Sequence, residues 1–222
     1  MIIPALDEER ALPRVLGDLP RDLVDEVIVV DNGSTDATAE VARRLGATVV
    51  AEPRRGYGSA CLAAIAYLRG RRPPPAIVAF LDADYSDDPA ELARLLGPIL
   101  ADTAEFVVGS RTLSAASRGS LTPQQRFGNA LAALLIRRLH GVRVTDLGPF
   151  RAIRWEALER LGMSDPDYGW TAEMQVKAAR LGLRTTEIAV SYRPRIGRSK
   201  ISGTLRGSAL AGVKILRTVL FS

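Results

Sequence analysis

The sequence predicts an α/β fold in which helices flank a parallel or mostly parallel sheet. Continuous apolar runs, typical of strands buried on both faces, occupy 26–31, 47–52 and 76–82. Helical patterns separate these runs, so strand and helix signals alternate along the first half of the chain. Two of the runs end in aspartate, at Asp31 and Asp82. Open α/β sheets bind ligands at the carboxyl ends of their strands, so we expect the functional site there.

The elements are expected in the following order. The chain begins with a short strand that turns at Pro4 into a helix whose first turn carries Asp7 and Glu9, because carboxylates suit the positive end of a helix dipole. The remaining strands are expected at 26–31, 47–52, 76–82, 105–109, 150–154 and 185–190. Helices are expected to end near residues 45, 68, 100, 140 and 181.

The end of the chain differs in character from the rest. In 204–222, Leu205, Val213 and Leu220 share one helical face, with Lys214 and Arg217 beside it, which predicts an amphipathic helix with a cationic flank. We therefore expect one domain over 1–203 and a terminal helix over 204–222. The terminal helix is expected to lie at a membrane interface, to pack on the domain, or to contact a second subunit in a homodimer.

Composition excludes several classes of protein. At 222 residues and 47% hydrophobic residues, the chain suits one large domain with an ample core. The single cysteine, Cys61, excludes a disulfide scaffold and a cysteine-based zinc site, and the single histidine, His140, leaves little room for a multi-histidine site. No apolar run reaches the roughly 18 residues of a membrane span. We expect a cytoplasmic protein, in contact with the inner face of the membrane at most as a peripheral protein.

The positive charge is concentrated near the C-terminus. The formal net charge is +5, yet the last acidic residue is Glu187, and only cations follow it. These are Arg193, Arg195, Arg198, Lys200, Arg206, Lys214 and Arg217. A cationic end on a nearly neutral body indicates one anionic contact surface, and its few aromatic residues argue against nucleic-acid binding.

Two carboxylates stand one residue apart where the 76–82 strand ends, in Asp82-Ala83-Asp84. Such side chains repel each other unless a hard cation or hydrogen-bond donors offset their charge. Mg²⁺ or Mn²⁺, bound by carboxylates, water and substrate phosphates, suits this pattern. In the alternative interpretation the pair only ends the strand, and Asp87 or Asp88 caps the next helix.

Taken in order, several motifs form a set. They are Pro4-Ala-Leu-Asp-Glu-Glu9, Val30-Asp-Asn-Gly-Ser-Thr-Asp36, Gly56-Tyr-Gly-Ser-Ala60, Asp82-Ala-Asp84 and Gly109-Ser-Arg111. This set resembles the family 2 glycosyltransferases of the GT-A (Rossmann-like) fold. Asp146-Leu-Gly-Pro-Phe-Arg151 and Arg195-Ile-Gly-Arg-Ser-Lys200 are similar to the branch that makes polyprenyl- and dolichyl-phosphate sugars. Ser86 departs from that branch, many of whose members carry glutamine at this position.

The resemblance implies an inverting, metal-dependent transfer of a hexose from a UDP- or GDP-linked donor to a polyprenyl phosphate. Asp84 would bind Mg²⁺ or Mn²⁺ directly, and Asp82 would act on the metal, through water, or on the ribose. The donor site implied by the resemblance comprises Pro4, Ala5, Asp7, Glu9, Asp31, Gly33, Gly56, Gly58, Asp82 and Ala83. The two glycines at 56 and 58 would let the backbone approach the donor closely.

An acceptor phosphate is already an anion, so it needs cations and no general base. The resemblance implies Arg111, Arg126, Arg195 and Lys200 as its ligands, with Asn129 and Ser199 as further donors.

Glu173 decides between two acceptors. With a hydroxyl acceptor, Glu173 would be the general base; with a phosphate, it would position the sugar or a basic side chain. In the purely structural interpretation, Glu173 has no role in the reaction and is an acid in the first turn of a helix, stabilised by the helix dipole. A non-catalytic protein that binds a sugar nucleotide is the alternative from another class.

Overall fold

The structure is a computed structural model that describes residues 1–114, 121–197, 212, 214 and 217–220. Ser199, Lys200 and most of the expected terminal helix lie outside these residues.

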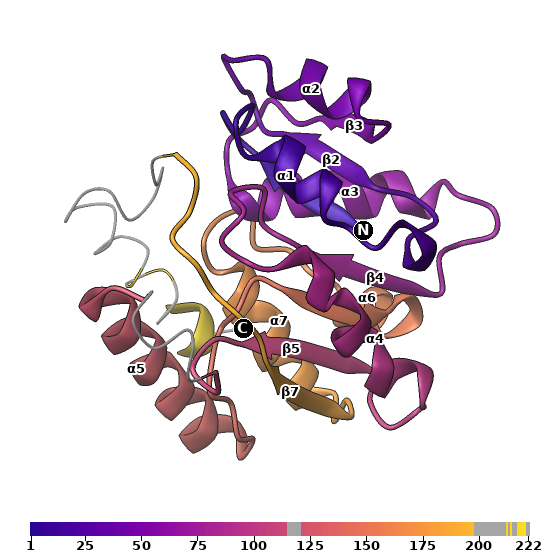
Figure 1. Ribbon diagram of the computed structural model, residues 1–222. Helices are drawn as coiled ribbons and strands as arrows, with labels where there is room; N and C mark the ends of the chain where they lie inside the picture. The colour runs from indigo at the N-terminus through magenta and orange to yellow at the C-terminus, as the bar shows by residue number, and fades with distance from the viewer. Residues whose placement is uncertain (115–120, 198–211, 213, 215–216, 221–222) are drawn as a thin grey trace.

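A seven-stranded sheet forms the centre of the molecule, in the order β3-β2-β1-β4-β6-β5-β7 (Figure 1). Only β6 runs antiparallel to its neighbours, β4 and β5, so the expected mostly parallel sheet is confirmed. The strands are β1 (Ile2–Ala5), β2 (Ile28–Asp31), β3 (Thr48–Ala51), β4 (Ile77–Phe80), β5 (Phe106–Ser110), β6 (Arg151–Arg154) and β7 (Thr185–Ala189).

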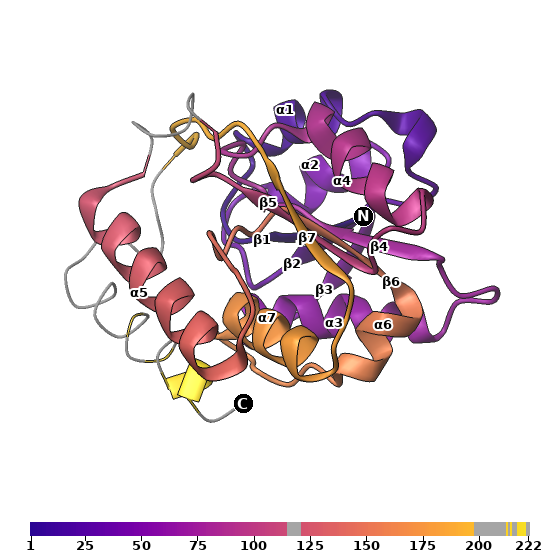
Figure 2. The same ribbon diagram turned by 90° about the horizontal axis from the view of Figure 1, so that it is seen from below.

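Helices cover both faces of this sheet (Figure 2). They are α1 (Leu12–Gly17), α2 (Thr38–Arg44), α3 (Tyr57–Arg69), α4 (Leu92–Leu100), α5 (Pro123–His140), α6 (Trp155–Leu161) and α7 (Trp170–Arg180), with 3-10 turns at Arg21–Leu23 and Pro89–Glu91. One layer holds α1, α2 and α4, and the other holds α3, α6 and α7.

The strands alternate between two apolar cores, which explains their continuous apolar runs. In β1, Ile3 packs under α1 and α4, whereas Ile2 packs on the side of α3. In β5, Val107 belongs to the first core and Phe106 to the second. A strand with helices on both faces has no side left for solvent, so both sets of alternate side chains are apolar.

Two expectations about local structure were wrong. Pro4 does not turn the chain; it lies inside β1, paired with Val30 of β2. The first helix begins at Leu12, and Asp7 and Glu9 lie in the preceding loop. Asp7 has a positive φ of 52°, which a helix cannot include.

A third, smaller core joins α5 to α7. It contains Ala132 and Ile136 of α5, Val176 of α7, and Val219 from the end of the chain. The described terminal residues 212, 214 and 217–220 are helical, and Thr218 and Val219 are buried. Among the described residues, no helix combines the length and the apolar character needed to cross a bilayer.

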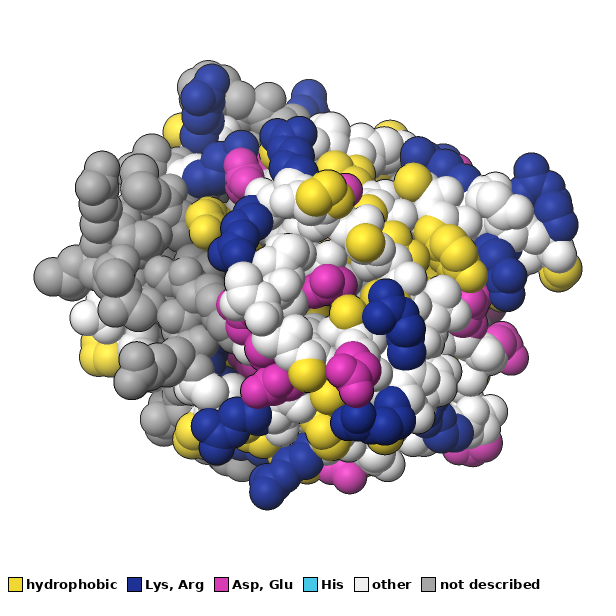
Figure 3. All heavy atoms as spheres, turned by 90° about the horizontal axis from the view of Figure 1, so that it is seen from above, with side chains coloured by type: hydrophobic (Ala, Val, Ile, Leu, Met, Phe, Trp, Pro, Cys, Tyr) yellow, Lys and Arg dark blue, Asp and Glu magenta, His cyan; other side chains and the backbone are white. Residues whose placement is uncertain are grey.

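The described surface carries charges of both signs. On the face seen in Figure 3, Lys and Arg side chains alternate with Asp and Glu and form no single basic patch within the described part of the chain. This agrees with the nearly neutral body expected from the sequence.

Candidate active site

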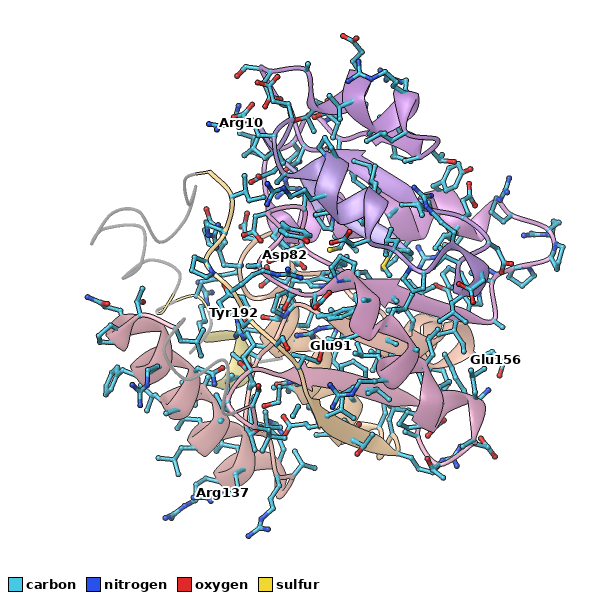
Figure 4. The ribbon with its side chains drawn as sticks, in the orientation of Figure 1. Arg10, Asp82, Glu91, Arg137, Glu156 and Tyr192 are labelled. Carbon is cyan, nitrogen blue, oxygen red and sulfur yellow. The ribbon has the colours of Figure 1, made fainter. Side chains whose placement is uncertain are left out.

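A cavity of about 380 Å³ opens at the carboxyl edge of the sheet. Its walls come from the end of β1, the loop after β2, the start of α3 and the turn after β4, where Asp82 lies between the two halves of the sheet (Figure 4). The lining residues are Pro4, Ala5, Leu6, Glu8, Asn32, Arg55, Gly56, Tyr57, Ala60, Asp82, Ala83, Asp84, Tyr168 and Arg195.

A larger hollow of about 530 Å³ lies at the opposite edge, between Met1, Glu26, Ala76 and Leu96. We assign the site to the smaller cavity because ligands of open α/β sheets bind beyond the carboxyl ends of the strands. The smaller cavity also contains the carboxylate pair.

The two acids of the pair have different surroundings. Asp84 is buried; its Oδ1 accepts from the backbone N of Ser86 at 2.9 Å, and its Oδ2 lies 3.0 Å from Nη1 of Arg195. Asp82 has the Tyr57 hydroxyl as a hydrogen-bond partner, and its Oδ1 has no partner among the described residues. Burial, followed by the charge of Asp84, raises the pKa of Asp82 to about 7.

Asp87, a third acid, lies buried behind this pair. Neither of its carboxylate oxygens has a hydrogen-bond partner within the described residues. Burial, and then the charge of Asp82, raise the pKa of Asp87 well above its usual value, against the opposing effect of Arg111. Carboxylates therefore outnumber their cationic partners at this edge.

This surplus of carboxyl groups over cationic partners fits a divalent cation, which would favour their ionised form. The described residues contain no group of three or more His, Cys, Asp or Glu that could hold a metal by themselves. A cation at Asp82 and Asp84 would therefore complete its coordination with water or with oxygens of a bound phosphate, as Mg²⁺ sites with one or two carboxylates do. The unpartnered Oδ1 of Asp82 is a suitable ligand.

Arg111, at the end of β5, is held by a buried acid and does not line the cavity. Its Nε and Nη2 donate to Asp146 at 2.8 and 2.7 Å, and its backbone N donates to the same carboxylate at 2.8 Å. Burial alone would lower the pKa of Arg111, but the hydrogen bond and charge of Asp146 raise it above the usual value. The expected direct contact with an acceptor is thus not available to Arg111 in this arrangement.

The segment 191–196, which we call the strap, crosses the turn after β4 and brings Arg195 into the cavity. The backbone N of Arg193 donates to Ser86 O and that of Ile196 to Asp84 O, both at 2.9 Å. The ring of Tyr192 lies 5.0 Å from the Arg111 guanidinium. The strap therefore places Arg195 beside the turn that carries Asp82 and Asp84. Through Tyr192 it also contacts Arg111, which comes from a distant part of the sequence.

The predicted donor residues of the first loops hold those loops together. Asp7 Oδ1 accepts from Thr35 N at 2.7 Å, and Glu9 Oε2 accepts from Ala37 N at 2.9 Å. Asp31 Oδ1 accepts from Ser34 N at 3.1 Å, next to Gly33 at φ +77°. None of these four predicted residues is among those that line the cavity.

Gly56 and Gly58 are needed for close packing within the protein, and the expected approach of the donor to their backbone stays a prediction. A Cβ at Gly56 would lie 2.3 Å from Pro166 O, and one at Gly58 would lie 1.9 Å from Asp165 O. The backbone of Ser59 also donates to Pro166 O at 2.7 Å. The glycines therefore admit the 165–167 loop against the start of α3, and only Gly56 also lines the cavity.

Asn129 and Arg126 of α5 do not reach the cavity lining. Asn129 Nδ2 donates to Thr145 O at 3.0 Å, and its Oδ1 accepts from Leu147 N at 2.8 Å, so its amide fixes the 145–147 segment. Asn129 is engaged within the protein in this conformation, and its role as an acceptor ligand stays a prediction. Arg126 is exposed.

Glu173 is buried and fully engaged outside the cavity. Its carboxylate accepts from Ser164 N, Ser164 Oγ and Asp165 N at 2.8–3.0 Å. It also pairs with Lys177 at 2.8 Å. These contacts fix the 164–165 loop and leave no oxygen directed at an acceptor, which argues against Glu173 as a general base.

Sequence reasoning missed several cavity residues, among them Asn32, Arg55 and Tyr57. Asn32 accepts from Gly56 N at 2.8 Å and donates to Glu52 O and Arg54 O, so it fixes the loop that carries Arg55. Tyr57 contacts Asp82 from inside the glycine motif. Arg55 and Tyr57 flank Gly56 in the sequence, and this position could have indicated that they line the cavity. The backbone groups that contact Asn32 are distant in sequence, so no sequence pattern identifies Asn32.

A parallel α/β sheet with a carboxylate pair at its carboxyl edge is the arrangement of the GT-A glycosyltransferases. The chain belongs to this class: the sequence model of glycosyl transferase family 2 matches residues 1–162. The chain is 42% identical to an uncharacterized glycosyltransferase of Mycobacterium tuberculosis, over 95% of this chain and 93% of the relative.

Named relatives agree with the expected branch. The chain is 32% identical to a dolichyl-phosphate hexose transferase of Haloferax volcanii, covering 99% of this chain and 93% of the relative. It is 31% identical to an undecaprenyl-phosphate mannosyltransferase of Micrococcus luteus, covering 96% and 90%. The resemblance to the branch that makes polyprenyl-phosphate sugars is thus confirmed.

Among solved structures, glucosyl-3-phosphoglycerate synthase from Mycobacterium tuberculosis is similar. Its complex with Mn²⁺, UDP and phosphoglyceric acid aligns with a TM-score of 0.78 and 26% identity, covering 99% of this chain and 76% of that one. The chain is therefore a glycosyltransferase of the GT-A fold.

The raised pKa of Asp82 predicts a pH-dependent stability in metal-free protein. A carboxyl whose pKa rises on folding stabilises the native state when protonated, so the free energy of unfolding should fall as the pH rises from about 4 to about 7. Asp82→Asn should reduce this slope, while the exposed Asp22→Asn should keep it. Urea unfolding in the presence of a chelator, between pH 4 and 8, measures both; equal slopes in all three proteins would contradict the assignment.

Proposed function

We propose that the chain transfers a hexose from a nucleotide sugar to a polyprenyl phosphate, with Mg²⁺ or Mn²⁺ bound at Asp84 and Asp82. The observation that carries this proposal is the presence in one cavity of an acid pair, of which Asp82 has an unpartnered oxygen, and an arginine, Arg195. Such a cavity suits a cation, a diphosphate and a second phosphate together.

A divalent cation, when bound, would neutralise the charge that develops on the departing nucleoside diphosphate. Asp84 and Asp82 are the ligands proposed from this chain, and Tyr57 orients Asp82 through its hydroxyl. Mn²⁺ and UDP are bound in the solved relative, which supports a nucleotide-sugar donor, proposed here as UDP- or GDP-linked.

The donor is proposed to lie against Pro4, Ala5, Gly56 and Ala83, with Arg55 at the cavity wall as a further cation. Asp7, Glu9, Asp31 and Gly33 contribute through the loop that they hold beside it. Gly58 contributes through the packing of α3 on the 165–167 loop.

An acceptor phosphate supports the reaction without a general base, because its attacking oxygen already carries negative charge. A direct attack opposite to the leaving group inverts the anomeric carbon. Arg195 is the cavity residue proposed to bind this phosphate, with Arg126, Ser199 and Lys200 as further ligands. Arg111, whose charge is balanced by Asp146, lies against the ring of Tyr192 in the strap.

A soluble acceptor with a hydroxyl nucleophile is the second candidate. The solved relative binds phosphoglyceric acid, a soluble phosphate compound. A hydroxyl needs a base, and Glu173, the residue expected in that role, is held by the 164–165 loop and Lys177. This arrangement favours the lipid phosphate.

The outward face of α5 supports a peripheral membrane contact. Phe127 and Leu134, seven residues apart on one face, are 72% and 40% exposed. The helix contains Arg126, Arg137 and Arg138 and no acidic residue, and it stands at the edge of the molecule (Figures 1 and 2).

An apolar stripe flanked by cations is the pattern of a helix that lies in a membrane interface. We propose that α5 and the 204–222 helix meet the inner face of the cytoplasmic membrane, with a second subunit as the alternative occupant.

Asp84→Ala should abolish transfer. Loss of the metal-binding carboxylate removes a contribution of several kcal/mol, so the rate should fall roughly 10³-fold or more. Transfer of radiolabelled hexose to a short prenyl phosphate in Mn²⁺ measures this, with Asp22→Ala as control. Substantial Mn²⁺-dependent activity in Asp84→Ala would refute the metal site.

Glu173→Gln separates the two acceptors. If Glu173 only holds the 164–165 loop, the variant should lose about 1–3 kcal/mol of stability and keep most of its kcat on a prenyl phosphate below its melting temperature. Steady-state kinetics and thermal unfolding together measure this. Near-total loss of turnover with intact donor binding would favour a hydroxyl acceptor with Glu173 as base.

Phe127→Glu should weaken binding to vesicles that contain anionic phospholipid, by roughly tenfold, because a charge replaces an inserted apolar ring. Leu100→Glu is a matched control: Leu100 is 70% exposed, against 72% for Phe127, but lies at the end of α4. Co-sedimentation with vesicles measures the partition. Equal losses in both variants would remove α5 from the membrane contact.

A further inference from the structure

Asp84 already has a cation in this structure, and the cation belongs to the chain itself. Arg195 Nη1 lies 3.0 Å from Asp84 Oδ2, with the Asp84 side chain 6% exposed and that of Arg195 29% exposed. The other carboxylate oxygen accepts from Ser86 N, and the backbone O accepts from Ile196 N. Asp84 is therefore satisfied without a metal ion.

A guanidinium and a divalent cation compete for this carboxylate. Both would approach the same side-chain oxygen inside one cavity, and two positive charges at contact distance repel strongly where water is scarce. Binding of the metal at Asp84 therefore requires the Arg195 side chain to leave. The strap need not unfold for this movement, because its backbone is tied separately through Arg193 N and Ile196 N.

We propose that Arg195 is a resident competitor of the metal: it neutralises Asp84 in the free protein, is displaced when a divalent cation binds, and is then free to bind the phosphate of the acceptor. This inference rests on the proposed function in one respect, the metal site at Asp84. It adds an order to the reaction, since the acceptor's ligand becomes available only after the metal has bound.

The strap supplies a matched control. Arg193 is two residues from Arg195 and also pairs with an aspartate, Asp88, at 3.1 Å. Its guanidinium stacks on Tyr85, 4.1 Å from the ring centre, and does not line the cavity. Removing either arginine changes the net charge equally, so a difference between them reports the contact with Asp84.

The experiment measures the affinity for Mn²⁺ alone, without nucleotide, by electron paramagnetic resonance of the free ion. Arg195→Met should bind Mn²⁺ roughly tenfold more tightly than the wild type, since the competing cation is gone. Arg195→Lys, which restores a positive charge, should return toward the wild-type affinity, and Arg193→Met should match the wild type. Thermal unfolding confirms that each variant is folded.

Each outcome decides a different question. Unchanged or weaker Mn²⁺ binding by Arg195→Met, with saturable binding by the wild type, overturns the competitor and leaves the metal site intact. An equal gain in Arg193→Met also overturns it, because the effect is then one of net charge. If neither the wild type nor Arg195→Met binds Mn²⁺ saturably, the metal site of the proposed function fails, and the inference fails with it.

Discussion

A carboxylate cannot remain ionised and unpaired inside a protein, and this constraint governs the carboxyl edge of the sheet. Asp82, Asp84, Asp87 and Asp146 lie there within the electrostatic reach of one another. Arg111 is bound to Asp146 and Arg195 to Asp84, which leaves the other two without a cationic partner among the described contacts. Three segments converge at this edge of the sheet: the end of β5, the 145–147 segment and the strap. Each carries a charged residue of this cluster, namely Arg111, Asp146 and Arg195.

The sheet could be predicted from the sequence because a strand buried on both faces needs apolar residues at nearly every position. Strands such as β2 and β4 are continuous apolar runs, whereas β6 and β7 carry Arg, Thr and Glu, and all seven strands were expected near their observed positions. The short helix α6 was missed, since it follows β6 without an intervening turn. The position of the aspartate pair was likewise predictable, because it directly follows a buried apolar run, and its role as a metal site stays a prediction.

The remaining site residues show why prediction stopped there. Glu173, Asn129 and Gly58 were assigned roles from the family pattern, yet each contacts a backbone segment that is distant in sequence or lies in a separate loop. The type of a residue shows which chemical groups its side chain can bind. It does not show which segment of the folded chain lies next to that side chain. The names of two relatives contain a lipid phosphate, undecaprenyl phosphate or dolichyl phosphate, and the solved neighbour is bound to phosphoglyceric acid. These compounds have a phosphate group in common. A cavity that contains an arginine, with Glu173 engaged outside it, agrees with that feature.

The position of β6 has a consequence for how the chain is made. The β3-β2-β1-β4 half of the sheet meets the β5-β7 half only through β6, which pairs with β4 on one edge and β5 on the other. During synthesis, β4 therefore presents an open edge until residues 151–154 have left the ribosome. An unpaired edge invites association with other chains, so this nascent protein passes through a vulnerable interval that ends with the arrival of a single strand.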